Sequence, residues 1–316
     1  MIVTLTANPS VDRTIDLAGR LERGEVQRAV RVRTDPGGKG VNVARAIVGA
    51  GELAVAVLPS RHDDPLVLAL RDANVPYRAV SVPGPVRVNV TITEPDGVTT
   101  KINDPGLALE ASTLDAMLVE LAREAAGARW AALSGSLPPG VPDDWYATVV
   151  RALRGRGSSI AVDTSGAPLA ALLAAGPESA PDLLKPNAEE LAELTGGDIA
   201  EIEADVRAAA AAARTLIARG VRTVLATLGA RGAVLVDATG AWVATPPPTV
   251  VRSTVGAGDS ALAGYLLADL AGADAAGRLQ RAVAYGAAAA SLPGSTAPQP
   301  DDAKPDAVRV EVLELG

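Results

Sequence analysis

The 316-residue sequence has no cysteine, no phenylalanine and a single histidine, and these gaps remove several classes of site. Without cysteine there is no disulfide, no thiolate metal site and no cysteine nucleophile. The lone His62 stands in SRHDDP, a stretch typical of a solvated turn. It argues against a Ser-His-Asp triad and against a multi-histidine metal site.

Lysine is also scarce, because only four of the 29 basic residues are lysines. Lys39, Lys101 and Lys185 lie in PGGKGVN, TTKINDPG and LLKPNAEE, segments marked by Gly, Pro or Asn. Turns are the usual place for polar residues, yet Lys and Arg are not interchangeable where a compact, flexible charge is needed. We therefore treat these three segments as candidate parts of a site.

Charge and hydropathy limit the partners. The net charge of -8 and the isoelectric point near 4.9 argue against nucleic acid or an anionic membrane as the main partner. No apolar run approaches the roughly 18 residues of a membrane span. The N-terminal MIVTLTANP lacks the pattern of a secretory signal. We expect a cytoplasmic protein.

The hydrophobic pattern predicts a single α/β domain over residues 1–316. Beyond residue 109, predicted helices alternate with short apolar strands, as in βαβ units around a parallel sheet covered by helices on both faces. Segments near 12–16, 25–34 and 77–103 alternate in polarity and predict a small antiparallel flap, suited to covering a ligand.

The segment TVGAGDSALAGY, residues 254–265, places an acid where a helix begins. A helix start presents unpaired N–H groups and about half a positive charge, so it attracts anions. The small residues Gly256, Ala257 and Gly258 allow close approach. Asp259 is then either a helix cap or a participant in chemistry.

Other marked turns follow predicted strands, where ligands gather in open α/β sheets: SGSLPPG, DTSG, KPNAEE and TLGARG. The chain has no Gly-x4-Gly-Lys-Ser/Thr phosphate loop. GGKGVNVA is not a dinucleotide fingerprint either, because Val43 stands where the third glycine would be. A dinucleotide-dependent dehydrogenase is therefore disfavoured.

Five motifs in order, spanning residues 36–264, resemble those of the ribokinase-like (PfkB) carbohydrate kinase family: PGGKGVNVARA, SGSLPPGVP, KPNAEEL, TLGARG and TVGAGDSALAG. TLTANPSVDRTI and KINDPG are similar to its 1-phosphofructokinase and tagatose-6-phosphate kinase branch. RHDDPLVLALRDANVPY departs from the family, since it replaces a glycine-containing turn. The resemblance implies a ribokinase-like three-layer sandwich with a mainly parallel sheet and a small antiparallel β flap (lid).

The resemblance also implies an activity. The γ-phosphoryl group of ATP would pass, with Mg²⁺, to the 6-hydroxyl of fructose 1-phosphate. Tagatose-6-phosphate kinase or 6-phosphofructokinase activity at the same site stays open, because motifs do not show how the sugar is oriented. A free-sugar or nucleoside kinase and a non-catalytic sugar-phosphate sensor rank lower. The family suggests a homodimer formed through the flaps.

The resemblance implies that Asp259 is the general base, with the backbone of Gly256, Ala257 and Gly258 facing the moving phosphoryl group. An aspartate near a helix N-terminus is expected to stay ionised and to be a weak base. Asn187 and Glu190 are expected to organise hydrated Mg²⁺, although Asn-x-x-Glu is equally typical of a capping box. The expected nucleotide contacts are Lys185, Asn187, Thr227, Gly229 and Gly232.

The residues expected to contact the phosphosugar lie in the flap or in turns marked by glycine. Asp12 and Asn42 suit sugar hydroxyls, and the cations suit a phosphate. For Arg28 and Arg87 the alternative is a place on the solvated face of a strand, without a role in binding. The expected contacts are Asp12, Arg28, Gly37, Gly38, Lys39, Asn42, Arg87, Asn89, Lys101 and Ser136.

Overall fold

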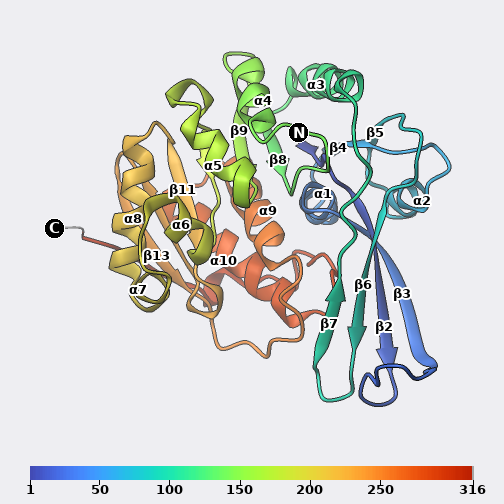
Figure 1. Ribbon diagram of the computed structural model, residues 1–316. Helices are drawn as coiled ribbons and strands as arrows, with labels where there is room; N and C mark the ends of the chain where they lie inside the picture. Colours follow the sequence, from blue (N-terminus) through green and yellow to red (C-terminus); the bar gives the residue numbers. More distant parts are fainter. Residues whose placement is uncertain (315–316) are drawn as a thin grey trace.

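The computed structural model describes residues 1–314 and contains a large sheet and a small one (Figure 1). The large sheet comprises β1 (Ile2–Leu5), β4 (Ala54–Pro59), β5 (Tyr77–Val80), β8 (Trp130–Ser134), β9 (Ser159–Asp163), β10 (Leu183–Leu184), β11 (Thr223–Thr227), β12 (Ala233–Asp237), β13 (Gly240–Thr245) and β14 (Arg309–Val312). Their spatial order is β14-β13-β12-β11-β10-β9-β8-β1-β4-β5. Neighbours are parallel from β5 to β11 and antiparallel from β11 to β14. This is the expected mainly parallel α/β architecture.

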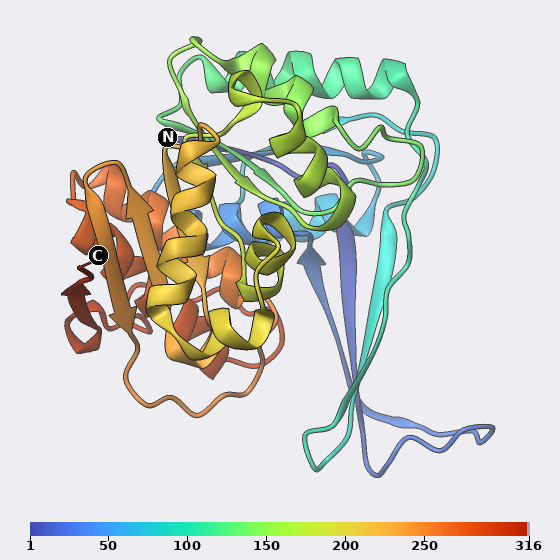
Figure 2. The ribbon, with the colours of Figure 1, turned by 60° about the vertical axis from the view of Figure 1, so that its left-hand side comes forward.

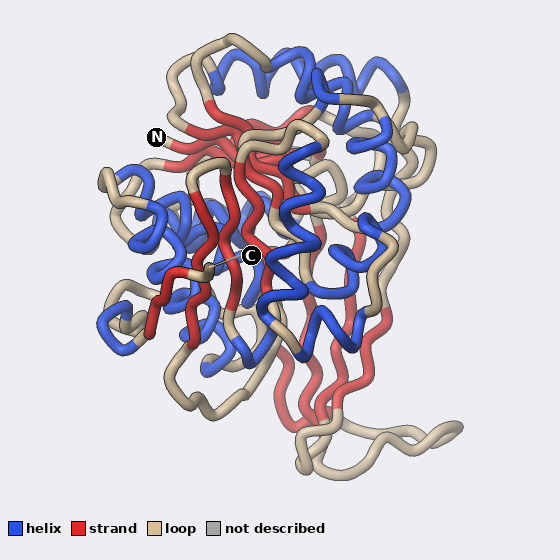
Figure 3. The backbone as a smooth tube through the Cα atoms, turned by 90° about the vertical axis from the view of Figure 1, so that its left-hand side faces the viewer, coloured by secondary structure: helices blue, strands red, loops and turns tan. Residues whose placement is uncertain are grey.

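Helices cover both faces of the large sheet (Figure 3). One face packs against α3 (Ala111–Ala125), α4 (Trp145–Leu153), α5 (Gly166–Ala174), α6 (Ala188–Thr195), α7 (Ile199–Ala204) and α8 (Val206–Ala218). The other packs against α1 (Lys39–Gly49), α2 (Pro65–Asp72), α9 (Ala257–Leu270) and α10 (Ala275–Ser291). Among residues 1–314, no helix is both long enough and apolar enough to cross a membrane.

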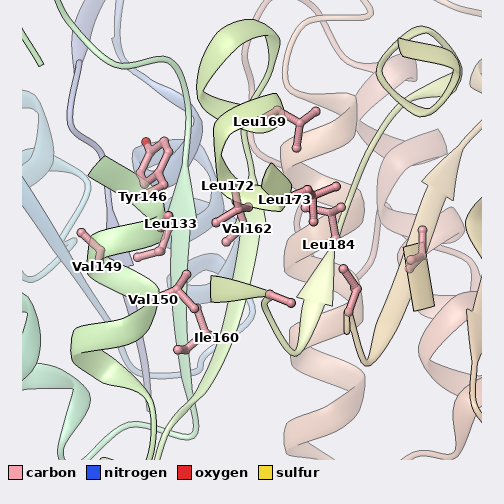
Figure 4. Close-up of a cluster of buried hydrophobic side chains, with 14 of the residues drawn as sticks. Leu133, Tyr146, Val149, Val150, Ile160, Val162, Leu169, Leu172, Leu173 and Leu184 are labelled. Carbon is pink, nitrogen blue, oxygen red and sulfur yellow. The ribbon is translucent and has the colours of Figure 1, made fainter. Parts of the chain in front are cut away.

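The core is built from aliphatic side chains, in keeping with the absence of phenylalanine. Because both faces are covered, β8 and β10 are buried along their whole length and read as continuous apolar runs. Figure 4 shows Leu133, Val162 and Leu184 of the sheet together with Leu172 of α5. Burying one such side chain stabilises the fold by about 1.5–3 kcal/mol.

The small sheet, which we call the lid, projects from the body of the molecule (Figure 2). It contains β2 (Ser10–Leu17), β3 (Ala29–Gly37), β6 (Arg87–Thr93) and β7 (Thr99–Ile102), in the order β3-β2-β6-β7. The outer pairs are antiparallel, whereas β2 and β6 in the middle are parallel. The lid is therefore two antiparallel pairs joined side by side, not one antiparallel meander.

Two boundaries of the predicted flap are wrong. Residues 77–80 form β5, which lies at the edge of the large sheet and pairs in parallel with β4. An edge strand with one exposed face alternates in polarity like a lid strand, so the pattern cannot separate them. Residues 25–28 belong to the loop before β3, and β3 itself continues through the turn-like DPG to Gly37.

Candidate active site

The candidate site lies where α1 and α9 begin, beside the carboxyl ends of β9 and β10. Parallel strands end at the same edge of a sheet, so the residues that follow them come together. Asp163 is the last residue of β9, and Lys185 directly follows β10. Lys39 is the first residue of α1, and Asp259 lies in the first turn of α9.

Asp259 does not cap α9. The N-cap is Gly256, whose φ of 76° is left-handed, and no side chain caps this helix. The Asp259 carboxylate instead accepts a hydrogen bond of 2.9 Å at Oδ2 from Asn42 Nδ2. Only 6% of Asp259 is exposed. The capping alternative is wrong, and Asn42, expected at a sugar hydroxyl, is engaged with this acid.

Burial raises the pKa of Asp259 to about 6. The negative charge of Asp163 acts in the same direction, while Lys39, the Asn42 hydrogen bond and Lys185 act against it. The helix N-terminus therefore does not keep this acid a weak base, because burial outweighs it. A carboxylate with this pKa is ionised at neutral pH and is a stronger proton acceptor than ordinary aspartate.

Asp163 holds two lysines from different parts of the chain. Lys39 Nζ lies 2.8 Å from Asp163 Oδ1, and Lys185 Nζ lies 3.1 Å from Oδ2. Burial opposes ionisation of Asp163, but the two ammonium groups prevail and lower its pKa. Burial likewise opposes the charge of Lys39, yet Asp163 raises the pKa of Lys39. Lys39 therefore remains charged in this setting.

The two lysines adjoin the first turn of α9. A Cβ placed on Gly258 would lie 3.2 Å from Lys185 Nζ, so the ammonium group reaches the first amides of the helix. Lys39 was expected among the lid cations, but its bond to Asp163 places it with Lys185. The turn and the two lysines together suit a multiply charged anion.

Asn187 and Glu190 form a capping box at the start of α6. Asn187 Oδ1 accepts from Glu190 N at 2.8 Å, and Glu190 Oε2 accepts from Asn187 N at 2.8 Å. The capping-box alternative is confirmed. Glu190 is buried, and burial raises its pKa. Its second oxygen, Oε1, is outside the box and is the group that a cation would use.

The TLGARG turn lies beside this capping box, since Thr227 forms a parallel β-bridge with Asn187. Gly229 begins a short 3-10 helix, Gly229–Arg231. Gly232 has φ 97°, and a Cβ there would collide with the Ala244 carbonyl oxygen. Gly232 is thus required by the backbone packing of β12 against β13, whatever it contributes to a nucleotide site.

Asp12 lies on β2 opposite Asn89 of β6 and Asp35 of β3, and its carboxyl group lies against Gly37. Asp12 Oδ1 accepts hydrogen bonds from Ser10 Oγ at 2.8 Å and from Asn89 Nδ2 at 3.0 Å. A Cβ on Gly37 would overlap the Asp12 carboxyl group, so any larger residue there would displace this carboxyl. Gly38 follows as the N-cap of α1.

The expected phosphate-binding cations are not all gathered. Arg87 is half-buried and donates from Nη1 to the Asp104 carbonyl at 3.1 Å. Lys101 is exposed on β7, and Arg28 is exposed in the loop that precedes β3. Ser136 Oγ accepts a hydrogen bond of 3.5 Å from Asn8 Nδ2, which ties the SGSLPPG turn to the segment between β1 and β2. Arg87 lies on β6, which pairs with β2, and there it feels the charge of Asp12.

Known proteins resemble this chain over nearly its whole length. Residues 5–302 match the pfkB family of carbohydrate kinases. The chain belongs to that family. It is 38% identical over 269 residues to the 1-phosphofructokinase of Xanthomonas campestris pv. campestris, covering 84% of this chain and 83% of the relative. It is 37% identical over 304 residues to the 1-phosphofructokinase of Rhodobacter capsulatus, covering 95% and 93%.

The crystal structure of phosphofructokinase-2 from Escherichia coli, in complex with substrates and products, has a TM-score of 0.87 to this pfkB kinase. The two chains are 31% identical, and the match covers 95% of this chain and 96% of the other. The ribokinase-like fold and the membership of a kinase family, both expected from the motifs, are confirmed.

A metal ion in this pfkB kinase would have few protein ligands. Within residues 1–314, His, Cys, Asp and Glu side chains form no group of three or more that could hold a metal ion. Mg²⁺ commonly binds through one or two carboxylates and keeps several waters and substrate phosphates as its other ligands. The carboxylate of Glu190 fits that mode, because burial raises its pKa and a bound cation would favour its ionised form.

Two residues of the site were not singled out from the sequence. Asp163 follows the apolar strand SIAV in DTSG, so the rule that drew attention to KPN and TLG applies to it equally. Ser10 gave no comparable signal. Its hydroxyl matters only because the register of β2 places it two residues before Asp12 on the same face.

Proposed function

We propose that this pfkB kinase transfers the γ-phosphoryl group of ATP to the 6-hydroxyl of fructose 1-phosphate, giving fructose 1,6-bisphosphate. The observation that carries the proposal is the buried Asp259, with a pKa near 6, beside the anion-binding turn of α9. Relatives named 1-phosphofructokinase, at 37% and 38% identity, support the choice of substrate.

In the proposed reaction, Asp259 accepts the proton of the attacking hydroxyl as the new O–P bond forms and the bond to ADP breaks. Phosphoryl transfer requires mainly positioning and stabilisation of charge on the phosphoryl oxygens. The amides of residues 256–258 and the ammonium groups of Lys39 and Lys185 supply that stabilisation. Asp163 holds both ammonium groups, with its Oδ1 2.8 Å from Lys39 Nζ and its Oδ2 3.1 Å from Lys185 Nζ.

The phosphosugar would lie between the body and the lid. Asp12 would accept sugar hydroxyls, with the backbone of Gly37 and Gly38 close to the ring. Arg87 would bind the phosphate that the sugar already carries. Its guanidinium is half-buried, and within residues 1–314 it donates one hydrogen bond, from Nη1 to the Asp104 carbonyl, so its other N–H groups are available to a phosphate. Ser136, Lys101 and Arg28 complete the proposed set, the last two from exposed positions.

We propose that Mg²⁺ binds through water to Glu190 Oε1 and the Asn187 side chain, beside Lys185, Thr227 and Gly229. Both capping-box residues remain held by their 2.8 Å bonds, so the carboxylate is already oriented. Bound Mg²⁺ would neutralise charge on the nucleotide phosphates. The ion would also offset the burial that raises the pKa of Glu190.

ADP release with Mg²⁺-ATP tests the function across fructose 1-phosphate, fructose 6-phosphate, tagatose 6-phosphate, fructose and ribose. The highest kcat/KM is expected with fructose 1-phosphate. Preference for another phosphosugar would replace the substrate and keep the mechanism. Preference for a free sugar would contradict the proposed role of Arg87. ATP consumption without a phosphosugar product would favour a sensor.

We also propose a homodimer formed through the lids. Alternate residues of a strand face opposite sides, so Asp12 and Asn89 share one face of the lid and Val32, Val88 and Ile102 share the other. These apolar residues are 45%, 43% and 59% exposed. An apolar sheet face of this kind suits a second copy of the same surface. A monomeric mass by light scattering would contradict the dimer, and Val88→Asp is expected to dissociate it.

A further inference from the structure

The carboxyl group of Asp12 is held by two donors that both reach the same oxygen. Ser10 Oγ lies 2.8 Å from Asp12 Oδ1, and Asn89 Nδ2 lies 3.0 Å from it. We infer that Ser10 is a positioning residue of the phosphosugar site, whose hydroxyl fixes Asp12 so that Oδ2 faces the substrate. The inference rests on the proposed function, in which Asp12 accepts sugar hydroxyls.

Ser10 is well placed for this task. It begins β2, two residues before Asp12, so the two side chains lie on the same face of the strand. Ser10 is fully buried. A buried hydroxyl needs a partner, and the Asp12 carboxylate is the one that it has. A hydrogen bond to a charged acceptor is about twice as strong as one between neutral groups.

The backbone of β3 also confines the Asp12 carboxyl group. Gly37 lies across from Ser10 in the β2–β3 register, and a Cβ at Gly37 would overlap the Asp12 carboxyl. The group is thus packed against the backbone of β3 on one side and hydrogen-bonded on another. Within residues 1–314, no side chain or amide donates a hydrogen bond to Asp12 Oδ2. That oxygen is the one left for a ligand.

A carboxylate fixed before binding loses less conformational freedom when the ligand arrives. Without the Ser10 hydroxyl, Asn89 alone would hold Oδ1, and the carboxyl group would rotate more freely about its own bond. The loss should weaken phosphosugar binding. It should leave nucleotide binding and the chemical step intact, because Asp259, Lys39 and Lys185 lie on other elements.

The first test compares Ser10→Ala with Ser60→Ala. Ser60 is equally buried, but its hydroxyl donates only to the neighbouring Arg61 carbonyl, at 3.1 Å. Ser10→Ala is expected to raise the KM for the phosphosugar about ten-fold, with kcat and the KM for ATP changed less than about two-fold. Ser60→Ala is expected to leave all three unchanged. Equal effects of the two variants would overturn the inference.

A double-mutant cycle with Asp12→Asn separates positioning from packing. If Ser10 acts through Asp12, Ser10→Ala will lower kcat/KM in the wild type and have little further effect in the Asp12→Asn background. An equal loss in both backgrounds would mean that Ser10 acts through local packing, which overturns the inference. Asn89→Ala removes the other donor to Oδ1 and is expected to raise the same KM.

The proposed function and this inference fail in different ways. The wild-type substrate panel alone decides which sugar is phosphorylated. The Ser10 comparison is then made with whichever phosphosugar the wild type prefers. Calorimetric titration of that phosphosugar into both variants repeats the comparison without turnover, and identical dissociation constants for the wild type and Ser10→Ala would overturn the role of Ser10.

Discussion

The amide of Asn42 donates a 2.9 Å hydrogen bond to Asp259 across 217 residues of sequence. The bond joins the first turns of α1 and α9, one carrying the glycine-rich GGKG segment and the other the proposed base. Asp259 shares the site with Asp163, which is equally buried. The pKa of Asp163 is lowered by two lysines, whereas burial raises that of Asp259.

Asp259→Asn is expected to lower kcat by about 10²–10⁴-fold, the usual contribution of a general base. The KM for ATP should change little, and ADP release measures both. Asp269→Asn is the matched control, because Asp269 lies buried on the same helix but bonds to Arg129 and Trp130. A control variant as inactive as Asp259→Asn would mean that the loss reflects damage to α9.

The dependence of activity on pH follows from the pKa of Asp259, which burial raises to about 6. Below this value the carboxyl is protonated and cannot accept a proton, so kcat/KM should rise between about pH 5 and 7 with a midpoint near 6. The profile is measured with saturating Mg²⁺-ATP. A profile that is flat over this interval would contradict the role of Asp259.

Asp259→Asn is also expected to make the protein more stable at pH 8. The raised pKa means that the folded state binds this proton more tightly than the unfolded state does, so stability falls as the pH rises from about 3.8 to about 6. A shift from 3.8 to about 6 corresponds to a cost on the order of 3 kcal/mol above that pH. Calorimetry should show a higher Tm for the variant at pH 8 and a smaller gain at pH 5, between the two pKa values; equal Tm values at pH 8 would count against it.

Asp163→Asn should act in the opposite direction on stability. Removing one partner of a buried ion pair costs about 3–5 kcal/mol, because the remaining charge is left uncompensated. Lys185 is almost fully buried, so its charge would be the one left behind. Both Tm and kcat should fall at neutral pH. A variant with unchanged kcat would show that the two lysines need no anchor.

Arg87→Ala is expected to raise the KM for the phosphosugar by about ten-fold or more, since a guanidinium–phosphate contact is charge-assisted. The KM for ATP should stay the same. Arg78→Ala is the control, because Arg78 pairs with Glu124 at the edge strand β5 and away from Asp12. Unaltered phosphosugar kinetics in Arg87→Ala would favour a free-sugar substrate.

Local patterns in the sequence were sufficient to predict the order of helices and strands along the chain. Apolar strands followed by marked turns correctly predicted the α/β sheet and placed KPNAEE and TVGAGD at strand or helix ends. Edge strand β5 was misassigned to the flap, because one-sided exposure produces the same alternation in either sheet. Pairing partners come from tertiary contacts, which a local pattern does not contain.

The site shows the same division. The motif was enough to identify Asp259 as a functional candidate. It could not predict the raised pKa of Asp259, because burial is a property of the folded chain. Lys39 was grouped with the lid cations on charge alone, and the structure pairs it with Asp163 at 2.8 Å. The spacing of Asn187 and Glu190 was compatible with a capping box and with a metal site. The capping box is confirmed, and the metal contact stays a prediction.

The lid is assembled from two stretches of chain, residues 10–37 and 87–102, with β4, α2 and β5 between them. Its central pairing joins Ser10 to Arg87, so it closes a long loop and cannot form from neighbouring residues. The chain between the two stretches forms β4 and β5, which lie at one end of the large sheet. The lid surface that carries Asp12 is therefore anchored through the body, and a change that displaces β4 or β5 should also disturb the pairing of β2 with β6.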